Sequence, residues 1–298
     1  MSTPVDQRSP HVNAGQADAP CPRAQRVLSP WPTVGWLCSA SPVPTSGRDR
    51  VDFDQVRQDW TTLGAQDPLW AVSVAPDKRG GRWDVDEFLA QGRRDVARAR
   101  AWLDRLGLPT RWDRVLDFGC GAGRLSQALA EYADEVVGVD VSVPMLETAR
   151  ALDRSGGRCR FVLNESPDLH VFPSGSFDLV FSELVLQHLP KRVITEYLAE
   201  FVRVLRPGAV ALVQCTTRPL WTLKGIGWRV APNPVVRFAQ RVVLDYPAPM
   251  RMTALPEARV RAVVGAHGGE VLDTATAPEP ATHWESTRYV IRKLGGGR

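Results

Sequence analysis

The glycine-rich stretch over residues 115–123 reads Val-Leu-Asp-Phe-Gly-Cys-Gly-Ala-Gly and decides the fold. A short apolar run ends in the acid Asp117, and three glycines then alternate at Gly119, Gly121 and Gly123. Apolar residues continue at helical spacing after the last glycine. This pattern predicts a strand that turns sharply into a helix, with a main chain bare enough for a ligand to lie directly on it.

The spacing of the glycines indicates which ligand this loop binds. A dinucleotide fingerprint needs its third glycine three residues after the second, where the helix N-terminus receives a pyrophosphate. Arg124 occupies that position and weakens the dinucleotide interpretation. The acid, the three glycines and the following helix instead resemble motif I of the class I S-adenosylmethionine-dependent methyltransferases, of the small-molecule type. The resemblance implies that the loop wraps the methionine and ribose portions of S-adenosylmethionine, with Asp117 near the cationic end and Cys120 as a small filler.

Four further stretches match that family in chain order. In the first, Val-Val-Gly-Val-Asp-Val-Ser over 136–142, Asp140 ends a strand nineteen residues past the second loop glycine. A carboxylate there can accept hydrogen bonds from both ribose hydroxyls. The resemblance adds Val141 and Met145 to the cofactor contacts, with Met145 against the adenine. Most dinucleotide-binding proteins carry the same acid, so Asp140 indicates a ribose without deciding between the cofactors.

The second stretch, Arg-Phe-Val-Leu-Asn-Glu-Ser over 160–166, covers the third expected strand and the residues that follow it. By resemblance, Glu165 accepts a hydrogen bond from the adenine amino group, and the Ser166 N–H reaches a ring nitrogen. Asn164 stands where the family often has glycine. Asparagine tolerates a left-handed backbone better than most residues.

The third and fourth stretches resemble the fourth strand with its turn, over 173–189, and the end of a helix, over 204–208. Because ligands bind at the carboxyl edge of such a sheet, the turn after the fourth strand is a place for catalytic groups. His188 is the candidate general base for an acceptor hydroxyl, the alternative being that it only caps or packs the turn. Glu183 is expected at the methionine end of the cofactor. The Pro-Gly turn that ends the helix carries no chemistry.

Strands and helices alternate from residue 114 onward, which predicts right-handed βαβ units and a parallel sheet covered on both faces. The expected fold is α/β, a doubly wound, mostly parallel seven-stranded sheet that ends, as the resemblance implies, in an antiparallel C-terminal hairpin. The expected strands are 114–118, 135–140, 160–163, 177–182, 209–216, 270–275 and 286–293. The expected helices are 84–106, 124–132, 144–153, 192–205 and 256–266.

The composition is that of an ordinary globular protein, with 44% hydrophobic and 23% charged residues among 298. Five cysteines form no CxxC pair and show no zinc spacing, so no metal site is expected. No apolar run approaches the roughly 20 residues of a membrane helix, and a cytoplasmic protein is expected. Residues 1–50, rich in Pro, Ser and Ala, predict a disordered extension. Residues 51–110 are expected to form a helical and aromatic cap segment, and 111–298 the cofactor-binding domain.

An insertion that combines basic and aromatic residues is expected at about 219–253, between the last parallel strand and the final helix. Five basic residues there accompany one acid. The insertion resembles the variable cap with which small-molecule methyltransferases select their acceptors. A patch for RNA phosphates, a surface for anionic lipid and a solvated face without a partner remain as alternatives.

These patterns predict a methyltransferase that uses S-adenosylmethionine and acts on a small organic acceptor, at oxygen before nitrogen or carbon. The alternatives are an RNA or protein methyltransferase, a nicotinamide-dependent oxidoreductase, and a cofactor-binding scaffold without catalysis. Neither the acceptor nor the oligomeric state follows from the sequence.

Overall fold

Seven strands form one sheet in the order β3-β2-β1-β4-β5-β7-β6. The first five in this order run parallel, and β7 runs antiparallel to both of its neighbours. The predicted mostly parallel sheet with an antiparallel hairpin is therefore confirmed. The strands are β1 (Trp112–Phe118), β2 (Ala133–Asp140), β3 (Cys159–Leu163), β4 (Phe177–Ser182), β5 (Leu205–Pro219), β6 (Gly269–Glu279) and β7 (Trp284–Lys293).

The computed structural model describes residues 47–221, 242, 246, 248–279 and 283–295. These residues all belong to one unit of the chain, residues 45–298. Most of the expected N-terminal extension and most of the expected insertion at 219–253 lie outside the described residues.

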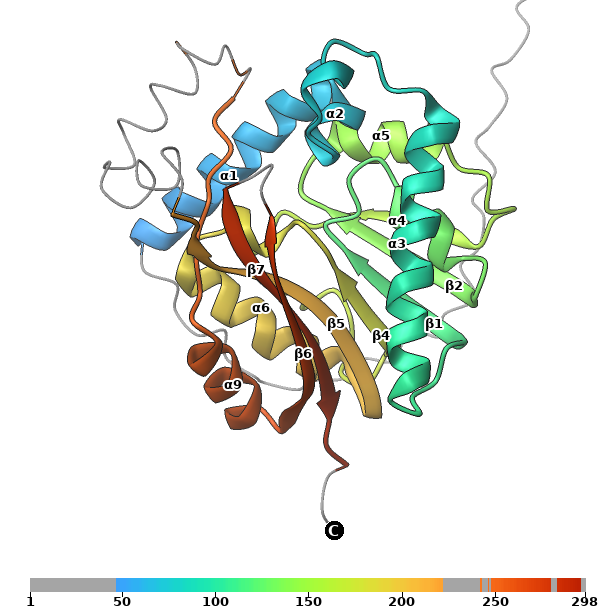
Figure 1. Cartoon of the computed structure of the whole chain (residues 1–298), viewed down its shortest axis with the longest axis vertical. Helices are drawn as coiled ribbons and strands as arrows, with labels where there is room; N and C mark the ends of the chain where they lie inside the picture. The colour runs from blue at the N-terminus through green and yellow to red at the C-terminus, as the bar shows by residue number, and fades with distance from the viewer. Residues whose placement is uncertain (1–46, 222–241, 243–245, 247, 280–282, 296–298) are drawn as a thin grey trace, which may run out of the picture. The chain divides into compact units, whose positions relative to one another are not determined.

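Helices cover both faces of the sheet, because neighbouring strand residues point to opposite sides. Val115 packs with α3 and α4 on one face, whereas the next residue, Leu116, packs with α6, α9 and α1 on the other. Figure 1 shows α3 running across β1 and β4, with α6 and α9 on the other side. The helices are α1 (Gly47–Gln66), α2 (Pro68–Val72), α3 (Val85–Arg105), α4 (Arg124–Leu129), α5 (Val143–Ala151), α6 (Lys191–Val204) and α9 (Glu257–Ala266), with short 3-10 turns η1 (Pro76–Lys78) and η2 (Leu186–His188).

The 20-residue helix α1 was not predicted, since its segment was interpreted as aromatic and without long periodicity. The signal was nevertheless present in the spacing of Phe53, Val56, Trp60 and Leu63, which recur on one helical face. Three of these side chains are buried, and Trp60 packs against the same core. The helix contacts α5 and α6, and so it lies at the carboxyl edge of the sheet (Figure 1).

Helix α3 begins as predicted at Asp84, whose side chain accepts the N–H of Glu87 at 2.9 Å. Further along, Gly92 brings α3 against the first turn of α4. A Cβ at Gly92 would lie 2.2 Å from the carbonyl oxygen of Arg124. The Asp95 carboxylate of α3 also pairs with the Arg124 guanidinium. Because Arg124 directly follows the glycine loop, this contact positions the loop as well as the helix.

Substituting alanine for Gly92 should therefore destabilise the protein. The added methyl group must push α3 away from the Arg124 carbonyl, and overpacking of this kind costs about 1–3 kcal/mol. Gly265 of α9 is the matched control, since a Cβ there meets no atom within 4 Å. Urea denaturation should show lower stability for Gly92→Ala and equal or higher stability for Gly265→Ala. Equal stabilities for Gly92→Ala and the wild type would contradict the close contact.

Candidate functional site

A cavity of about 350 Å³ lies at the carboxyl edge of the sheet. The loops that follow β1, β2 and β4 form its floor, and residues of α1 and α2 lie against them. This is the edge at which open α/β sheets bind ligands, and the volume is within the range of small-molecule sites.

The glycine loop after β1 has the conformation that its sequence predicts. Gly119, Gly121 and Gly123 have φ angles of 74°, 51° and 83°, all in the left-handed region that favours glycine. There is also no room for a side chain, since a Cβ at Gly119 would lie 2.3 Å from Val185 and one at Gly121 would lie 2.5 Å from Val72. The loop therefore presents bare main chain to the cavity.

Asp140 at the end of β2 holds this loop in place. One oxygen of its carboxylate accepts the N–H of Gly121 at 2.9 Å, and the other accepts the N–H of Ser142 at 2.9 Å. Burial raises the pKa of Asp140, while the main-chain N–H groups oppose the shift. The carboxylate lines the cavity and keeps further lone pairs for hydroxyl donors.

Two residues predicted around the loop face away from solvent. Asp117 lies beneath it, where one carboxylate oxygen accepts the Ser126 hydroxyl at 2.6 Å and the other has no hydrogen-bond partner among the described residues. Burial raises the pKa of Asp117 to about 6. Cys120 is 3% exposed and packs with Leu146 and Phe161. Burial raises the pKa of the Cys120 thiol, which agrees with a packing role.

The structure brings the predicted catalytic residue His188 and most of the predicted cofactor residues to one cavity. Those that line it are Gly119, Cys120, Gly121, Asp140, Val141, Met145, Glu183 and His188. Asp117, Gly123, Glu165 and Ser166 are not on its walls. The side chain of Glu165 is 54% exposed and forms an ion pair with Arg57 of α1 at 2.5 Å. The adenine contacts proposed for Glu165 and Ser166 therefore stay a prediction.

His188 lies in η2, lines the same cavity as Asp140 and is 7% exposed. Its Nδ1 is 2.7 Å from the carbonyl oxygen of Arg251, so Nδ1 carries the proton and donates it. Nε2 is then the acceptor, and it lies 3.2 Å from the side-chain amide nitrogen of Gln187. The Trp60 ring lies edge-on at 4.9 Å between ring centroids. Burial lowers the pKa of His188 to about 4, so the imidazole is neutral at pH 7.

Glu183 occupies the end of β4 beside a strained residue. Arg288 of β7 donates two hydrogen bonds to one Glu183 oxygen, at 2.8 and 2.5 Å. The next residue, Leu184, has a φ of 64°, which costs free energy for a side chain with a Cβ. Its N–H donates to the Gln214 side chain at 2.6 Å, and this bond offsets part of the strain. Side chains of β5 and β7 thus fix the turn after β4.

The charges around the cavity favour a cationic ligand. Among the described residues, the acidic and basic side chains on its walls are, apart from histidine, Asp140, Glu183 and Arg124. Arg124 is paired with Asp95, and Glu183 is paired with Arg288. Asp140 accepts only main-chain donors in the described part of the chain. In the described part of the chain, no unpaired cation lines the cavity to meet a diphosphate, whereas ribose hydroxyls and a sulfonium fit this carboxylate. The residues present fit S-adenosylmethionine.

Several cavity residues were not predicted from the sequence as site residues. Trp60 belongs to the unpredicted helix α1, and Gln187 is adjacent in the chain to the histidine that was singled out. Tyr197 comes from the buried face of α6 and lines the cavity as well. Only the aromatic spacing of α1 carried a signal in the sequence. The other two side chains look like ordinary turn and core residues.

Residues 115–208 match the family model described as a methyltransferase domain. The chain is 29% identical over 155 residues to 2-methyl-6-phytyl-1,4-hydroquinone methyltransferase of Synechocystis sp., covering 52% of this chain and 48% of that protein. It is 35% identical over 109 residues to a ubiquinone biosynthesis O-methyltransferase of Aromatoleum aromaticum, covering 36% of this chain and 45% of that protein. Magnesium protoporphyrin IX methyltransferase of Synechocystis PCC 6803 shares the fold, with a TM-score of 0.54 and 21% identity over 80% of this chain and 98% of that one.

The fold, the glycine loop and the family match are those of a class I S-adenosylmethionine-dependent methyltransferase domain. The chain spans about half the length of the curated relatives it matches. No helix in the described part is both long and apolar enough to cross a membrane.

The low pKa of His188 predicts how stability depends on pH. A histidine in the unfolded chain binds its proton near pH 6.5, whereas His188 in the folded chain binds one only near pH 4. The unfolded state therefore binds more protons between these values, and the His188 contribution to stability falls as the pH falls from 6.5 to 4. Denaturation of the wild type and His188→Gln should show the variant gaining relative stability over this window, by up to about 1.4 kcal/mol per pH unit.

Asp117 gives a second test, in which stability should change with pH in the opposite direction. Its pKa is about 6 in the folded protein against 3.8 for the ordinary group, so its contribution rises as the pH falls through that interval. Asp117→Asn should thus lose relative stability where His188→Gln gains it. Parallel pH profiles for the wild type and both variants would contradict the burial of these two groups.

Proposed function

We propose that this protein transfers a methyl group from S-adenosylmethionine to a hydroxyl group of a small, uncharged, apolar acceptor. The observation that carries the proposal is the single cavity that joins the glycine loop and Asp140 to the neutral imidazole of His188. The relative named an O-methyltransferase of ubiquinone biosynthesis supports oxygen as the target, and the relative named a hydroquinone methyltransferase supports an apolar aromatic acceptor.

The cofactor end of the cavity is built from the loops after β1 and β2. Asp140 accepts the ribose hydroxyls, and the bare main chain at Gly119 and Gly121 borders the ribose and methionine portions. Met145, buried one turn into α5, packs against the base. Glu183 accepts from the cofactor's ammonium group while it remains paired with Arg288. When bound, S-adenosylmethionine supplies an activated methyl group on a sulfonium.

The acceptor end of the cavity is apolar, with one polar pair. Trp60, Met250 and Met252 line it, and these side chains favour a flat apolar molecule. His188 Nε2 accepts the hydrogen bond of the acceptor hydroxyl in place of the Gln187 amide, and takes the proton as the methyl group is transferred. The Gln187 side-chain oxygen is buried without a hydrogen-bond partner among the described residues, and it accepts from a second donor on the ligand.

Other partners of the acceptor site depend on the insertion at 219–253, most of which lies outside the described residues. Contacts of its basic residues with RNA or anionic lipid stay predictions. The cavity gives less support to a nicotinamide-dependent oxidoreductase than to a methyltransferase, since its described walls offer Asp140 and no unpaired cation for a diphosphate.

Cofactor binding can be tested directly by calorimetry with S-adenosylhomocysteine. Asp140→Ala should weaken binding at least tenfold, on the order of 1.5 kcal/mol, because a charged acceptor of two ribose hydroxyls is lost. Asp134→Ala is the matched control, since Asp134 is an exposed aspartate at the other end of the same strand. Binding of NADH by the wild type, or unchanged affinity of Asp140→Ala, would overturn the assigned cofactor site.

The role of His188 is tested by turnover with a panel of hydroquinones and phenols. His188→Gln should lower kcat on the order of a hundredfold, the scale of general base catalysis. Its affinity for S-adenosylhomocysteine should stay within about twofold, because the ring nitrogens of His188 contact Gln187 and Arg251 and not Asp140. Above pH 6 the wild-type rate should not vary with the protonation of His188, since its pKa is about 4. Equal kcat values for variant and wild type would remove His188 from the chemistry.

A further inference from the structure

Residues 250–255, which lead into α9, form a strap across the turn that carries His188. The N–H of Thr253 donates to the carbonyl oxygen of Gln187 at 2.7 Å. Two residues earlier, the carbonyl oxygen of Arg251 accepts the Nδ1 proton of His188 at 2.7 Å. Main-chain groups of the strap therefore bind two consecutive residues of η2.

The end of β5 holds the strap from the other side. The hydroxyl of Thr216 donates to the carbonyl oxygen of Thr253, and the carbonyl oxygen of Thr216 accepts the N–H of Leu255 at 2.9 Å. Thr216 is 1% exposed and Thr253 is 8% exposed, so water does not compete for these groups. Thr253 thus joins the two elements, since its N–H binds the turn and its carbonyl binds the strand.

The strap is also part of the cavity wall. Met250 and Met252 line the cavity, and Arg251, whose carbonyl accepts from His188, lies between them in the chain. Met250 is buried in a cluster with Leu63 of α1. One segment therefore shapes the wall beside the imidazole and orients the ring.

The Arg251 carbonyl decides which ring nitrogen of His188 carries the proton. With Nδ1 donating to this carbonyl, Nε2 keeps its lone pair, which accepts from the Gln187 amide at 3.2 Å. An imidazole that loses the carbonyl can carry its proton on either nitrogen. A ring with the proton on Nε2 cannot take a second proton there as a base, so the strap sets the form of the ring that general base catalysis needs.

We propose that Thr216 is a positioning residue for His188, which acts through Thr253 and the strap to keep the proton on Nδ1 and Nε2 free to act as the base. The inference rests on the proposed function, in which His188 takes the proton of the acceptor hydroxyl. Thr216 is not among the residues that line the cavity, so it acts on the reaction only through the residues that it holds.

Three substitutions on β5 isolate this hydroxyl. Thr216→Val keeps the shape of the side chain but leaves the buried Thr253 carbonyl without its donor, whereas Thr216→Ser keeps the donor. Thr217→Val is the matched control, because Thr217 is the next residue and its hydroxyl pairs with that of Thr287 at 2.9 Å. It therefore loses a hydroxyl that does not touch the strap.

The first measurement is nitrogen-15 NMR of the full-length protein with labelled histidine, at about pH 8, where the His188 ring is neutral. The wild type should show a protonated Nδ1 and an unprotonated Nε2, and Thr216→Val should show both tautomers. Thr216→Ser and Thr217→Val should keep the wild-type tautomer. The spectrum of His188→Gln identifies the signal, since it lacks this ring.

The second measurement is turnover with the hydroquinones and phenols. Thr216→Val should lower kcat about tenfold, because part of the population has the wrong ring nitrogen protonated. The KM of the acceptor and the affinity for S-adenosylhomocysteine should stay within about twofold, since the substitution leaves the cavity lining intact. Thr216→Ser should recover most of the lost rate.

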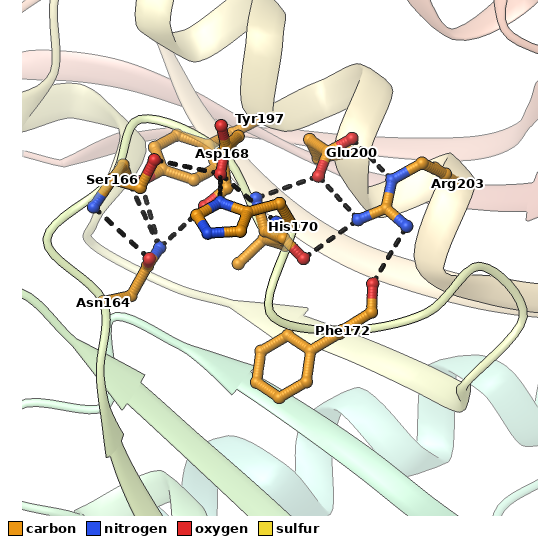
Figure 2. Close-up of polar contacts among 9 residues, drawn as sticks. Asn164, Ser166, Asp168, His170, Phe172, Tyr197, Glu200 and Arg203 are labelled. Atoms are coloured by element: carbon orange, nitrogen blue, oxygen red, sulfur yellow. Dashed lines mark hydrogen bonds and ion pairs between the residues drawn. The ribbon is translucent and has the colours of Figure 1, made fainter. Parts of the chain in front are cut away.

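Arg203→Ala controls for a general loss of stability. Arg203 of α6 donates to the carbonyl oxygens of Leu169 and Phe172, each at 2.9 Å, and so holds the loop after β3 (Figure 2). These hydrogen bonds do not involve the strap. The variant should have a lower melting temperature than the wild type but the same His188 tautomer.

The outcomes separate the inference from the proposed function. A wild type with the proton on Nε2, or Thr216→Val with the wild-type tautomer, overturns the inference alone. A changed tautomer in Thr216→Val with an unchanged kcat overturns the role of His188 as the base, and the inference with it. Should Thr216→Val fail to fold, Thr216→Ala decides, because it removes the same donor without adding bulk.

Discussion

The main-chain N–H groups that converge on Val139 and Asp140, at the end of β2, organise the whole carboxyl edge of the sheet. The Val139 carbonyl accepts the N–H groups of Gly119 and Cys120 at 2.7 and 3.0 Å. The Asp140 side chain accepts those of Gly121 and Ser142, and its carbonyl accepts that of Asn164. Two consecutive residues therefore hold the loops after β1, β2 and β3. A buried carboxylate is costly, and these donors offset the cost while fixing the position of the Asp140 carboxylate.

Different contacts fix the part of the cavity beside His188. His188 is placed by a single turn after β4 and by the carbonyl of Arg251, which is 63 residues away in the chain. Its environment is aromatic and apolar, with Trp60 at its edge. Carboxylates therefore line the cavity beside the glycine loop and β4, and a neutral imidazole lines it in the turn after β4. Under the proposed function, this arrangement suits the transfer of a group from a cation to an uncharged hydroxyl.

The sheet could be predicted closely because its strands are short apolar runs between turn residues, a local signal. The predicted bounds of β4 match the observed ones, and those of the other strands differ by a few residues. The helix α1 escaped prediction because its polar faces hide the apolar stripe of Phe53, Val56 and Leu63. Prediction from the sequence was limited in the same way at the loop after β3, within the site. Its residues were identified, but their hydrogen bonds to Tyr197 depend on the packing of α6.

The sequence by itself determined the glycine loop, the acid at the end of β2, the order of strands and helices, and hence the class of cofactor. Each of these depends on residues adjacent in the chain, where left-handed backbone or strand periodicity leaves little choice. Only the tertiary structure decided that α1 lies against the cavity, that Glu165 pairs with Arg57, and that His188 is buried and neutral. These features depend on contacts between distant segments, and burial sets the pKa of a side chain whose sequence neighbours give no sign of it.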